Sequence, residues 1–291
     1  MTIFSGLHSK IIWYINRTFC ARFLKAILRY KIRFAIEVRR NLVRELVLTR
    51  GEREIVSCLE TSGVADVGHI LDRDALEDLA LLCTSSSQSV DRSSSSEGQN
   101  KPFWNKIIDN SQEGIIDSSS PTVAVALGES LIKILCAYYR EVPRLDYVLL
   151  TESIYAEGAP SKSQLWHRDY DDTDVVKLFV YLSDVTTIDD GPFTILPFSI
   201  SDRIGFTLKS HLNDGELPSE FASPILGKKY TAFLVNTRRI WHCGSRLSNG
   251  SKRYLYTATF IKSPRLFPEP PVRFGESGLL DPVRKLVLSV D

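Results

Sequence analysis

The chain has 291 residues, of which 43% are apolar and 24% charged, and its formal net charge is +1. This composition is that of a soluble globular protein with a sizeable core, and it excludes a strong overall attraction to nucleic acid or membranes. No two of its five cysteines (Cys20, Cys58, Cys83, Cys136 and Cys243) are closely spaced. This argues against a disulfide framework or a Cys-x-x-Cys zinc site and favours a reducing, cytoplasmic compartment.

The N-terminal segment is basic. Residues 1–35 contain no Asp or Glu but seven Lys or Arg, interspersed with apolar residues at spacings that suit one side of a helix. The simpler interpretation is a basic amphipathic helix docked on the rest of the domain. The alternative is a segment that contacts a membrane surface. No apolar run reaches the roughly 18 residues that a membrane span needs.

The chain divides into three regions by composition. Residues 1–83 have helical spacings, residues 84–100 form a Ser-rich loop too polar to pack, and residues 101–291 form the main domain. Within that domain, Ser120 and Pro121 form an N-cap followed by proline at the first helical position. We expect the helix that they start to continue through Leu135 and to end before Pro143.

Short β-strands follow this helix. The segments rich in Val, Ile, Tyr, Phe and Thr between turn residues are 147–155, 163–167, 175–182, 193–196, 231–235 and 254–261. Helices first and strands afterwards predict an α+β, mainly β fold, a β-sandwich or barrel with the N-terminal and flanking helices packed outside it.

The segment 175–182 has two different faces. Val176, Leu178 and Val180 alternate with Lys177 and the aromatic residues that follow it. The aliphatic face is expected to pack against helices or a second sheet. The other face suits the lining of a polar cavity, although Lys177 could equally extend to water from a strand end.

Three residues form a candidate metal site. His167 and Asp169 are two residues apart, so on a strand both side chains point to the same side. His242 follows a predicted strand and is the natural third ligand. Two histidines and one carboxylate on one face of an ion are typical of non-haem Fe(II) oxygenases. His-x-Asp alone is also common in solvated turns, but Arg253, eleven residues after His242, could pair with the carboxylate of a cosubstrate.

With these residues in place, the segment from about residue 147 to 262 resembles the phytanoyl-CoA dioxygenase family of 2-oxoglutarate oxygenases. The matching motifs are Gln164 before His-x-Asp, the strand KLFVYLSDVT, the turn Asp190-Gly191-Pro192, Ile195-Leu196-Pro197, and Trp241-His242 with Arg253 at the usual spacing. The sequence departs from the family at residues 197–200, which read Pro-Phe-Ser-Ile in place of Pro-Gly-Ser-His. Because that loop borders the substrate in the family, the substrates of known members do not carry over.

The resemblance implies a double-stranded β-helix (jelly-roll, cupin-like) core that binds Fe(II), 2-oxoglutarate and O₂. Fe(II) would be held by His167, Asp169 and His242. Arg253 would bind the far carboxylate of 2-oxoglutarate. Helpers at the cosubstrate site would be Lys177, Thr257 and Gln164. The implied activity is hydroxylation of a small organic or lipid-derived substrate, with release of succinate and CO₂ and without nucleic acid as a partner.

Two other functions fit the same residues. One is a non-catalytic jelly-roll binding protein, and the other is a cupin-type metalloenzyme that does not use 2-oxoglutarate. The remaining histidines, His8, His69 and His211, have no partner pattern and are expected to be surface or core residues. Cys243 is expected to face away from the metal, since neighbours on a strand point to opposite sides. Trp166, Phe179, Tyr181 and Trp241 are candidates for a dry cavity wall or for ordinary core.

Overall fold

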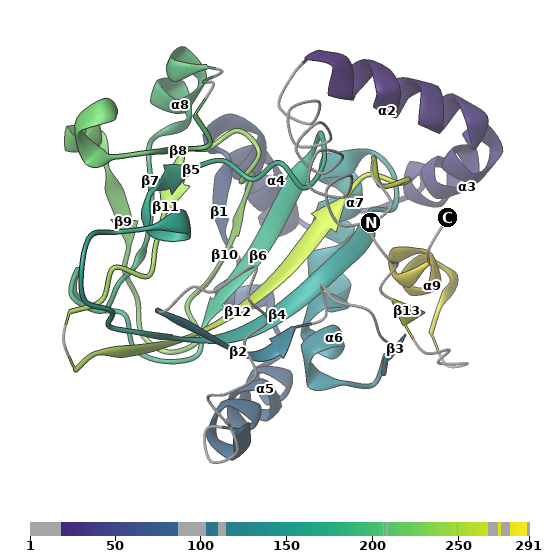
Figure 1. Ribbon diagram of the computed structural model, residues 1–291. Helices are drawn as coiled ribbons and strands as arrows, with labels where there is room; N and C mark the ends of the chain where they lie inside the picture. Colours follow the sequence, from purple (N-terminus) through teal and green to yellow (C-terminus); the bar gives the residue numbers. More distant parts are fainter. Residues whose placement is uncertain are drawn as a thin grey trace, which may run out of the picture.

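The structure is a computed structural model that describes residues 19–86, 103–109, 115–205, 207, 209–248, 250–266, 273–274 and 280–289. The predicted loop 84–100 lies largely outside these residues. Two antiparallel sheets face each other, and helices cover the outer side of the larger sheet (Figure 1). The mixture of helices and antiparallel sheets is as predicted. Closure of the sheets into a double-stranded β-helix stays a prediction.

The larger sheet contains the longest strands. Its order is β1 (Val64–Asp66), β10 (Ala232–Val235), β6 (Val175–Tyr181), β12 (Lys252–Ile261), β4 (Arg144–Ile154) and β2 (Trp104–Asp109). All neighbouring pairs are antiparallel. The strands predicted within residues 147–155, 175–182, 231–235 and 254–261 are all present here, with ends shifted by a few residues.

The smaller sheet is built from very short strands. Its order is β8 (His211–Leu212), β5 (Trp166–His167), β11 (His242–Cys243), β7 (Phe193–Ile195) and β9 (Ser223–Ile225). The predicted strand 163–167 is wrong in its first half, where Lys162–Gln164 forms a 3-10 turn. The Gln164 side chain accepts a hydrogen bond from the Ser161 N–H, and this capping box curls the chain before β5 begins. A separate parallel pair joins β3 (Ile115–Ile116) to β13 (Arg273–Phe274).

Helices from both ends of the chain share one core with the larger sheet. The α-helices are α2 (Phe19–Lys31), α3 (Arg33–Arg44), α4 (Arg50–Ser62), α5 (Arg73–Ser86), α6 (Pro121–Ala126), α7 (Glu129–Tyr139), α8 (Phe198–Ile204) and α9 (Pro282–Leu288). Further 3-10 turns are Gly68–Ile70, Asp214–Glu216 and Ser219–Phe221. Buried residues of α4, α5, α6, α7 and α9 pack with those of β4, β6, β10 and β12 in a single cluster.

The helix predicted from Pro121 through Leu135 is two helices. It starts at Pro121 as expected, but α6 ends at Ala126 and α7 begins at Glu129. Gly128 is the N-cap of α7, with φ −51° and ψ 136°, outside the helical region. Glycine has a low helix propensity and is well tolerated at an N-cap, which accounts for the break.

Strand β6 uses its two faces as predicted. Val176, Leu178 and Val180 are fully buried in the cluster under the helices. Lys177 and Phe179 point to the opposite side, into the space between the sheets. Lys177 is only 7% exposed, so it does not extend to water from a strand end. All five cysteines are free, as predicted.

Candidate metal centre

The three predicted metal ligands come together between the two sheets. His167 on β5 and His242 on β11 are direct partners in the antiparallel register. Asp169 follows β5, and its backbone N–H donates to the Thr237 carbonyl at 3.0 Å. The ligand atoms of His167, Asp169 and His242 all lie within 4.8 Å of one another. The pairing of β5 with β11 therefore assembles a 2-His-1-carboxylate set from two distant segments.

Both imidazoles are held in the same way. Nδ1 of His167 lies 2.9 Å from the Leu165 carbonyl, and Nδ1 of His242 lies 3.0 Å from the Ile240 carbonyl. A carbonyl can only accept, so each Nδ1 carries the proton and the lone pair of each ring is on Nε2. Such outer partners fix the tautomer and orientation of histidines that bind metals. Burial also lowers the pKa of His242, which favours the neutral form that a metal requires.

Lys177 supplies the charge that balances Asp169. Its Nζ lies 2.8 Å from Oδ2 of Asp169 and 3.0 Å from Oδ2 of Asp171. Burial alone would raise the pKa of Asp169, but the Lys177 ammonium outweighs it and holds that pKa well below its usual range. Asp169 is therefore an ionised carboxylate before any metal arrives.

A small network keeps Lys177 in place. Lys177 donates to the Tyr147 hydroxyl at 2.8 Å, and that hydroxyl donates to Asp171 at 2.9 Å. Burial alone would lower the pKa of Lys177. The charges of Asp169 and Asp171 together have the larger effect, and they raise this pKa well above its usual value. The buried ammonium is charged and fully paired, as a buried charge must be.

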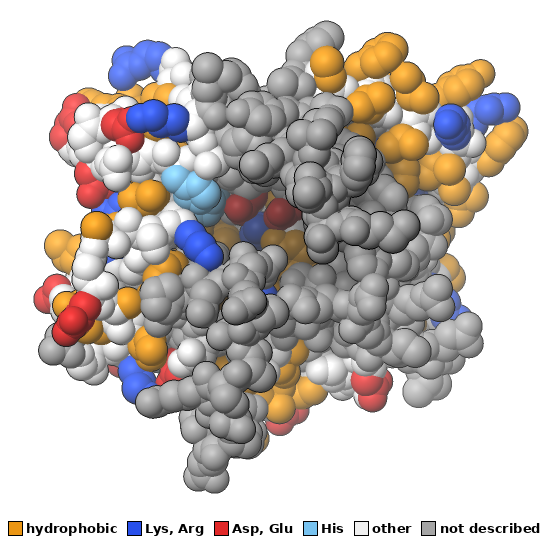
Figure 2. Space-filling view, in the orientation of Figure 1, with side chains coloured by type: hydrophobic (Ala, Val, Ile, Leu, Met, Phe, Trp, Pro, Cys, Tyr) orange, Lys and Arg blue, Asp and Glu red, His pale blue; other side chains and the backbone are white. Residues whose placement is uncertain are grey.

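The triad opens into a cavity of about 830 Å³ between the sheets. Other residues that line it include Trp104, Lys106, Asp146, Tyr147, Leu149, Phe179, Phe193, His211, Ser245, Leu255, Thr257 and Arg265. The space-filling view shows a hollow in which acidic and histidine side chains are visible (Figure 2). A volume of this size is typical of small-molecule sites.

Arg253 lies in the same cavity and is only 1% exposed. It donates to the Gly191 carbonyl, to Ser245 Oγ at 2.7 Å and to Ser153 Oγ at 3.3 Å. Its Nε has no hydrogen-bond partner, and no carboxylate among the described residues pairs with it. Burial lowers its pKa, but an arginine remains charged in proteins. A buried cation held only by neutral groups is suited to an anionic ligand.

Gly191 lets the chain approach Arg253 closely. It has φ +65°, and a Cβ at this position would lie 2.7 Å from Leu247 Cδ1. Glycine is therefore required at the turn before Pro192. The Asp190-Gly191-Pro192 motif thus places the Gly191 carbonyl against the guanidinium of Arg253.

The register of the larger sheet gives the backbone positions of Lys177 and Arg253 relative to each other. Thr259 on β12 is opposite Lys177, and Thr257 is opposite Phe179. Arg253 is six residues before Thr259, which is roughly 20 Å along the strand. The backbones of Lys177 and Arg253 are therefore well apart along the sheet, but the Arg253 guanidinium lies beside Gly244, two residues after His242, and so reaches the strands that carry the metal ligands. Thr257 lies between Arg253 and Thr259 on β12 and lines the cavity.

Gln164 lies beside the cavity rather than in its lining. Its amide nitrogen donates to the Ser245 carbonyl at 2.9 Å, while the Ser245 hydroxyl accepts from Arg253. Of the four candidate wall aromatics, Phe179 lines the cavity. Trp166, Tyr181 and Trp241 are buried in apolar clusters beside it. Cys243 packs with the two tryptophans and is not part of the metal-ligand group.

His211 lines the cavity, although the sequence predicted an ordinary surface or core residue. It is the register partner of His167 across β8 and β5, and their ring centroids lie 5.4 Å apart. The two-residue strand β8 carries no periodic signal, so nothing in the sequence near His211 could have revealed this pairing.

Asp146 is a second residue that sequence reasoning missed. On β12, Thr259 pairs with Tyr147 and the next residue, Phe260, pairs with Leu145. Asp146 is therefore the extra residue of a β-bulge, a feature that re-aims side chains next to active sites. Its carboxylate is buried in the cavity lining without a hydrogen bond, 3.4 Å from an Arg265 nitrogen. Burial raises the pKa of Asp146 to about 6.

The residues present fit an iron ion and a dicarboxylate cosubstrate. Two imidazoles whose Nε2 atoms carry the lone pair and one ionised carboxylate are the donors of a facial triad. The unpaired Nε and the buried charge of Arg253 fit a carboxylate in the same cavity. The cavity therefore contains one group of residues suited to a metal ion and another suited to an anion.

Comparisons with known proteins support the fold. No protein-family model and no curated protein matches the sequence. Among solved structures, AviO1 from Streptomyces viridochromogenes is similar with a TM-score of 0.54 and 16% identity, over 77% of this chain and 100% of that one. The epimerase SnoN, in complex with Fe3+, alpha-ketoglutarate and a nogalamycin, has a TM-score of 0.55 and 13% identity, over 73% and 84%.

A third similar structure is HygX from Streptomyces hygroscopicus, with nickel and 2-oxoglutarate bound, which has a TM-score of 0.51 and 16% identity over 75% and 88% of the two chains. The resemblance to 2-oxoglutarate oxygenases that the motifs indicated is therefore confirmed at the level of the fold.

Proposed function

We propose that this protein is a non-haem Fe(II)- and 2-oxoglutarate-dependent oxygenase that oxidises a small organic substrate. The observation that carries the proposal is the joint presence, in one cavity, of the His167–Asp169–His242 triad and the buried Arg253 that lacks a carboxylate partner. The triad alone would also suit zinc, but a cupin-type zinc enzyme has no need of a buried arginine. The similar structures of SnoN and HygX each contain a metal and 2-oxoglutarate, which agrees with the proposal.

His167, Asp169 and His242 would hold the iron, and Arg253 would pair with the far carboxylate of 2-oxoglutarate. Bound iron would supply the activation of O₂, with 2-oxoglutarate as the reductant that leaves as succinate and CO₂. The carbonyls of Leu165 and Ile240 keep the Nδ1 protons of the two histidines, so Nε2 is the nitrogen that would bind the metal.

The other residues of the cavity prepare the site. Lys177 keeps Asp169 ionised and oriented. Phe179, Phe193 and Leu255 line the cavity and would exclude water from it. The carboxylate of Asp169 occupies the position at which a halogenating enzyme needs a small residue. We therefore assign oxidation by hydroxylation, and a chlorinated main product from the wild-type protein would contradict this assignment.

An anaerobic titration with Fe(II) and 2-oxoglutarate tests the class of enzyme. A chelate of the two gives a visible metal-to-ligand charge-transfer band. We expect the band in the wild type, its loss in His167→Ala, and a much higher 2-oxoglutarate requirement in Arg253→Ala. Arg50→Ala is the control, because Arg50 is exposed on α4, pairs with Glu54 at 2.8 Å and does not line the cavity.

The outcomes separate the alternatives. A wild-type protein that binds metal but gives no band with 2-oxoglutarate would be a cupin-type metalloenzyme or a binding protein. A band without any turnover of 2-oxoglutarate to succinate in air would indicate a non-catalytic protein that keeps the site.

A further inference from the structure

Helices α2 and α3 carry an unusual exposed apolar stripe. Of the twelve large hydrophobic residues that are exposed in the described chain, six lie on these two helices. They are Phe23, Ile27, Tyr30, Phe34, Val38 and Leu42, at spacings of three or four residues. Phe34 is 75% exposed and Tyr30 is 69% exposed. In Figure 2 the hydrophobic side chains gather over these helices at the upper right.

Ion pairs on the opposite side of α2 keep the stripe facing outward. Lys25, which is 4% exposed, bonds to both oxygens of the fully buried Asp172 at 2.8 Å. Arg29 pairs with the buried Glu141 through both of its terminal nitrogens. These buried ion pairs fix the rotation of α2, because breaking one leaves an uncompensated charge. The apolar stripe therefore faces away from the core in the folded protein.

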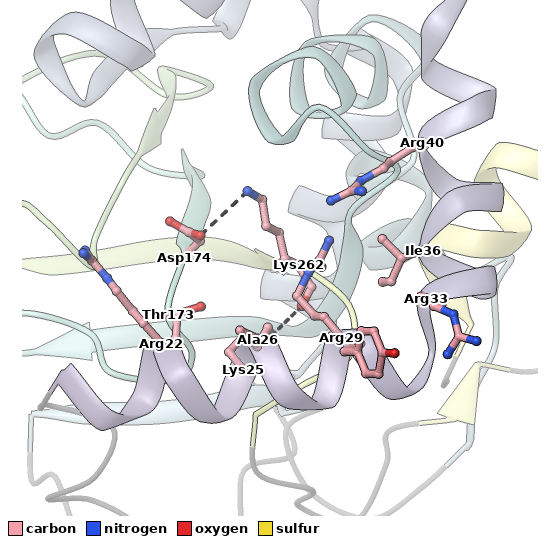
Figure 3. Close-up of a pocket in the computed structure, with 11 residues that line it drawn as sticks. Arg22, Lys25, Ala26, Arg29, Arg33, Ile36, Arg40, Thr173, Asp174 and Lys262 are labelled. Atoms are coloured by element: carbon pink, nitrogen blue, oxygen red, sulfur yellow. Dashed lines mark hydrogen bonds and ion pairs between the residues drawn. The ribbon is translucent and has the colours of Figure 1, made fainter.

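A cationic cavity lies beside the stripe. It has a volume of about 540 Å³ and is lined by six basic side chains and a single acidic one, Asp174. The basic residues are Arg22, Lys25, Arg29, Arg33, Arg40 and Lys262. Figure 3 shows Arg22 and Lys262 on either side of Asp174, with Arg40 reaching toward Lys262 from the next helix.

The positive charge of this cavity is only partly neutralised. Asp172, Asp174 and Glu141 are the carboxylates paired with its cations, which leaves an excess of three positive charges. No carboxylate of the described residues forms an ion pair with Arg22 or Arg33. The Arg33 guanidinium lies instead 4.7 Å from the ring centroid of Phe34, so positive charge borders the stripe itself.

An exposed apolar face next to unpaired cations is the pattern of a helix that lies in a membrane interface. Aromatic and aliphatic side chains enter the boundary between headgroups and acyl chains, while Lys and Arg meet lipid phosphates. None of the described helices is long and apolar enough to cross a membrane. We infer that the α2–α3 surface docks on an anionic phospholipid bilayer, with a headgroup phosphate in the cavity lined by Arg22 and Arg40.

The docking surface is connected to the metal centre. Asp172, the partner of Lys25, lies three residues after the metal ligand Asp169. It also accepts from the Leu266 backbone N–H at 2.9 Å, next to Arg265 of the central cavity. Helix α2 therefore lies between the docking surface and the segments that border the proposed active site.

Co-sedimentation of the full chain with vesicles tests the inference. The two vesicle types are phosphatidylcholine alone and phosphatidylcholine mixed with phosphatidylserine. We expect binding to the mixed vesicles that weakens as salt is raised, and much weaker binding to the neutral ones. Arg22→Gln and Arg33→Gln should each weaken binding by about fivefold, and the pair Phe23→Ser with Phe34→Ser by at least about tenfold.

Matched controls remove comparable groups elsewhere on the surface. Ile188→Ser removes an apolar side chain that is 73% exposed, and Arg50→Gln removes an exposed arginine on α4. Both should bind vesicles as the wild type does. Absence of vesicle binding, or equal loss in the variants and controls, would overturn the inference.

Two further measurements test whether a soluble anion or a second copy of the chain binds to this surface in place of the bilayer. Calorimetry with inorganic phosphate, at constant ionic strength, detects a soluble anion in the cavity. Sedimentation velocity of the wild type and of Phe34→Ser detects a second copy of the chain on the stripe. Phosphate binding without vesicle binding, or a dimer that Phe34→Ser dissociates, would each replace the bilayer as the occupant. Because none of these variants touches the triad or Arg253, these results are independent of the proposed enzyme activity.

Discussion

His167 and His242 face each other as register partners across β5 and β11, and their ring centroids lie 4.3 Å apart. Each of these strands is only two residues long. Because the ladder between them is so short, the two histidines are positioned mainly by their Nδ1 bonds to Leu165 and Ile240 and by the packing of Trp166 and Trp241. The short strands of the smaller sheet therefore present the metal ligands, while the long strands of the larger sheet present Lys177 and Arg253.

The first prediction distinguishes the metal ligand His167 from the neighbouring His211, which we do not expect to bind the metal. His167→Ala should weaken Ni(II) binding by at least about a hundredfold, since even outer partners of metal ligands are worth ten- to a hundredfold. His211→Ala should bind Ni(II) within a few-fold of the wild type, because His211 lies outside the ligand group although its ring is 5.4 Å from that of His167. Calorimetry with Ni(II), which does not oxidise in air, measures both. Equal losses in the two variants would show that His211 is also a ligand.

The second prediction concerns the groups that hold Arg253. Ser245→Ala removes a hydroxyl that accepts from the guanidinium at 2.7 Å. A hydrogen bond to a charged group contributes about 1.5 kcal/mol or more, so the Kd for 2-oxoglutarate should rise on the order of tenfold. Gln164→Leu should act in the same direction but more weakly, because Gln164 reaches Arg253 only through Ser245.

For Ser245→Ala and Gln164→Leu, the affinity for 2-oxoglutarate is measured and compared with the affinity for Ni(II). Both variants should bind Ni(II) as the wild type does, because neither contacts the triad. Ser248→Ala, in the same loop but bonded to Asp189, is the control and should change neither affinity. A parallel loss of metal and cosubstrate binding would mean that Ser245 supports the fold of the loop rather than the position of Arg253.

Much of the larger sheet could be predicted from the sequence, because its long strands show clear alternation. The aliphatic face of β6 was predicted correctly, since Val176, Leu178 and Val180 lie in the main core. Of the two alternatives left open for Lys177, the structure has the one in the cavity lining. The triad could be predicted because the spacing of His167 and Asp169 is local. His242 was the natural third ligand because it follows a predicted strand, and its ligand atom lies with those of His167 and Asp169 in the structure.

The remaining features depend on contacts between distant residues. Strands of two or three residues, such as β5, β8 and β11, are too short to show a period. The place of His211 follows from the β5–β8 register, and that of Asp146 follows from a bulge against β12. The break at Gly128 was available in the sequence, but the strong apolar periodicity around it favoured one continuous helix.

The third prediction tests the balance of charge at the metal end. Lys177→Met leaves the partly exposed Asp169 and Asp171 without the buried cation that they share. Removing one partner of a buried ion pair costs about 3 to 5 kcal/mol, so the metal-free variant should be clearly less stable. A bound divalent ion would replace the lost charge. Ni(II) should therefore raise the Tm of the variant by more than it raises that of the wild type.

Lys252→Met is the control for that experiment. Lys252 is largely exposed and pairs with Glu152 at 3.2 Å, an interaction worth about 1 kcal/mol or less. Its loss should leave both the metal-free Tm and the effect of Ni(II) nearly unchanged. If Ni(II) raised the Tm of Lys177→Met no more than that of the wild type, Lys177 would not act as the counter-charge of Asp169.

The fourth prediction follows from the raised pKa of Asp146. Burial moves this pKa from its ordinary value of 3.8 to about 6. Between these values the unfolded chain has lost the proton while the folded protein still holds it, so the contribution of Asp146 to stability falls as pH rises. The fall amounts to about 3 kcal/mol between about pH 4 and 7, and it ends above the folded pKa.

Asp146→Asn removes this titration. The free energy of unfolding of the variant, relative to the wild type, should therefore increase by about 3 kcal/mol between about pH 4 and 7 when measured by urea unfolding. Glu157→Gln, on an exposed carboxyl, should leave the pH dependence unchanged. A constant difference between Asp146→Asn and the wild type at both pH values would mean that Arg265, 3.4 Å away, keeps Asp146 ionised throughout. Asp146 would then be one half of a permanent ion pair in the cavity wall rather than a carboxyl that takes up a proton near neutral pH.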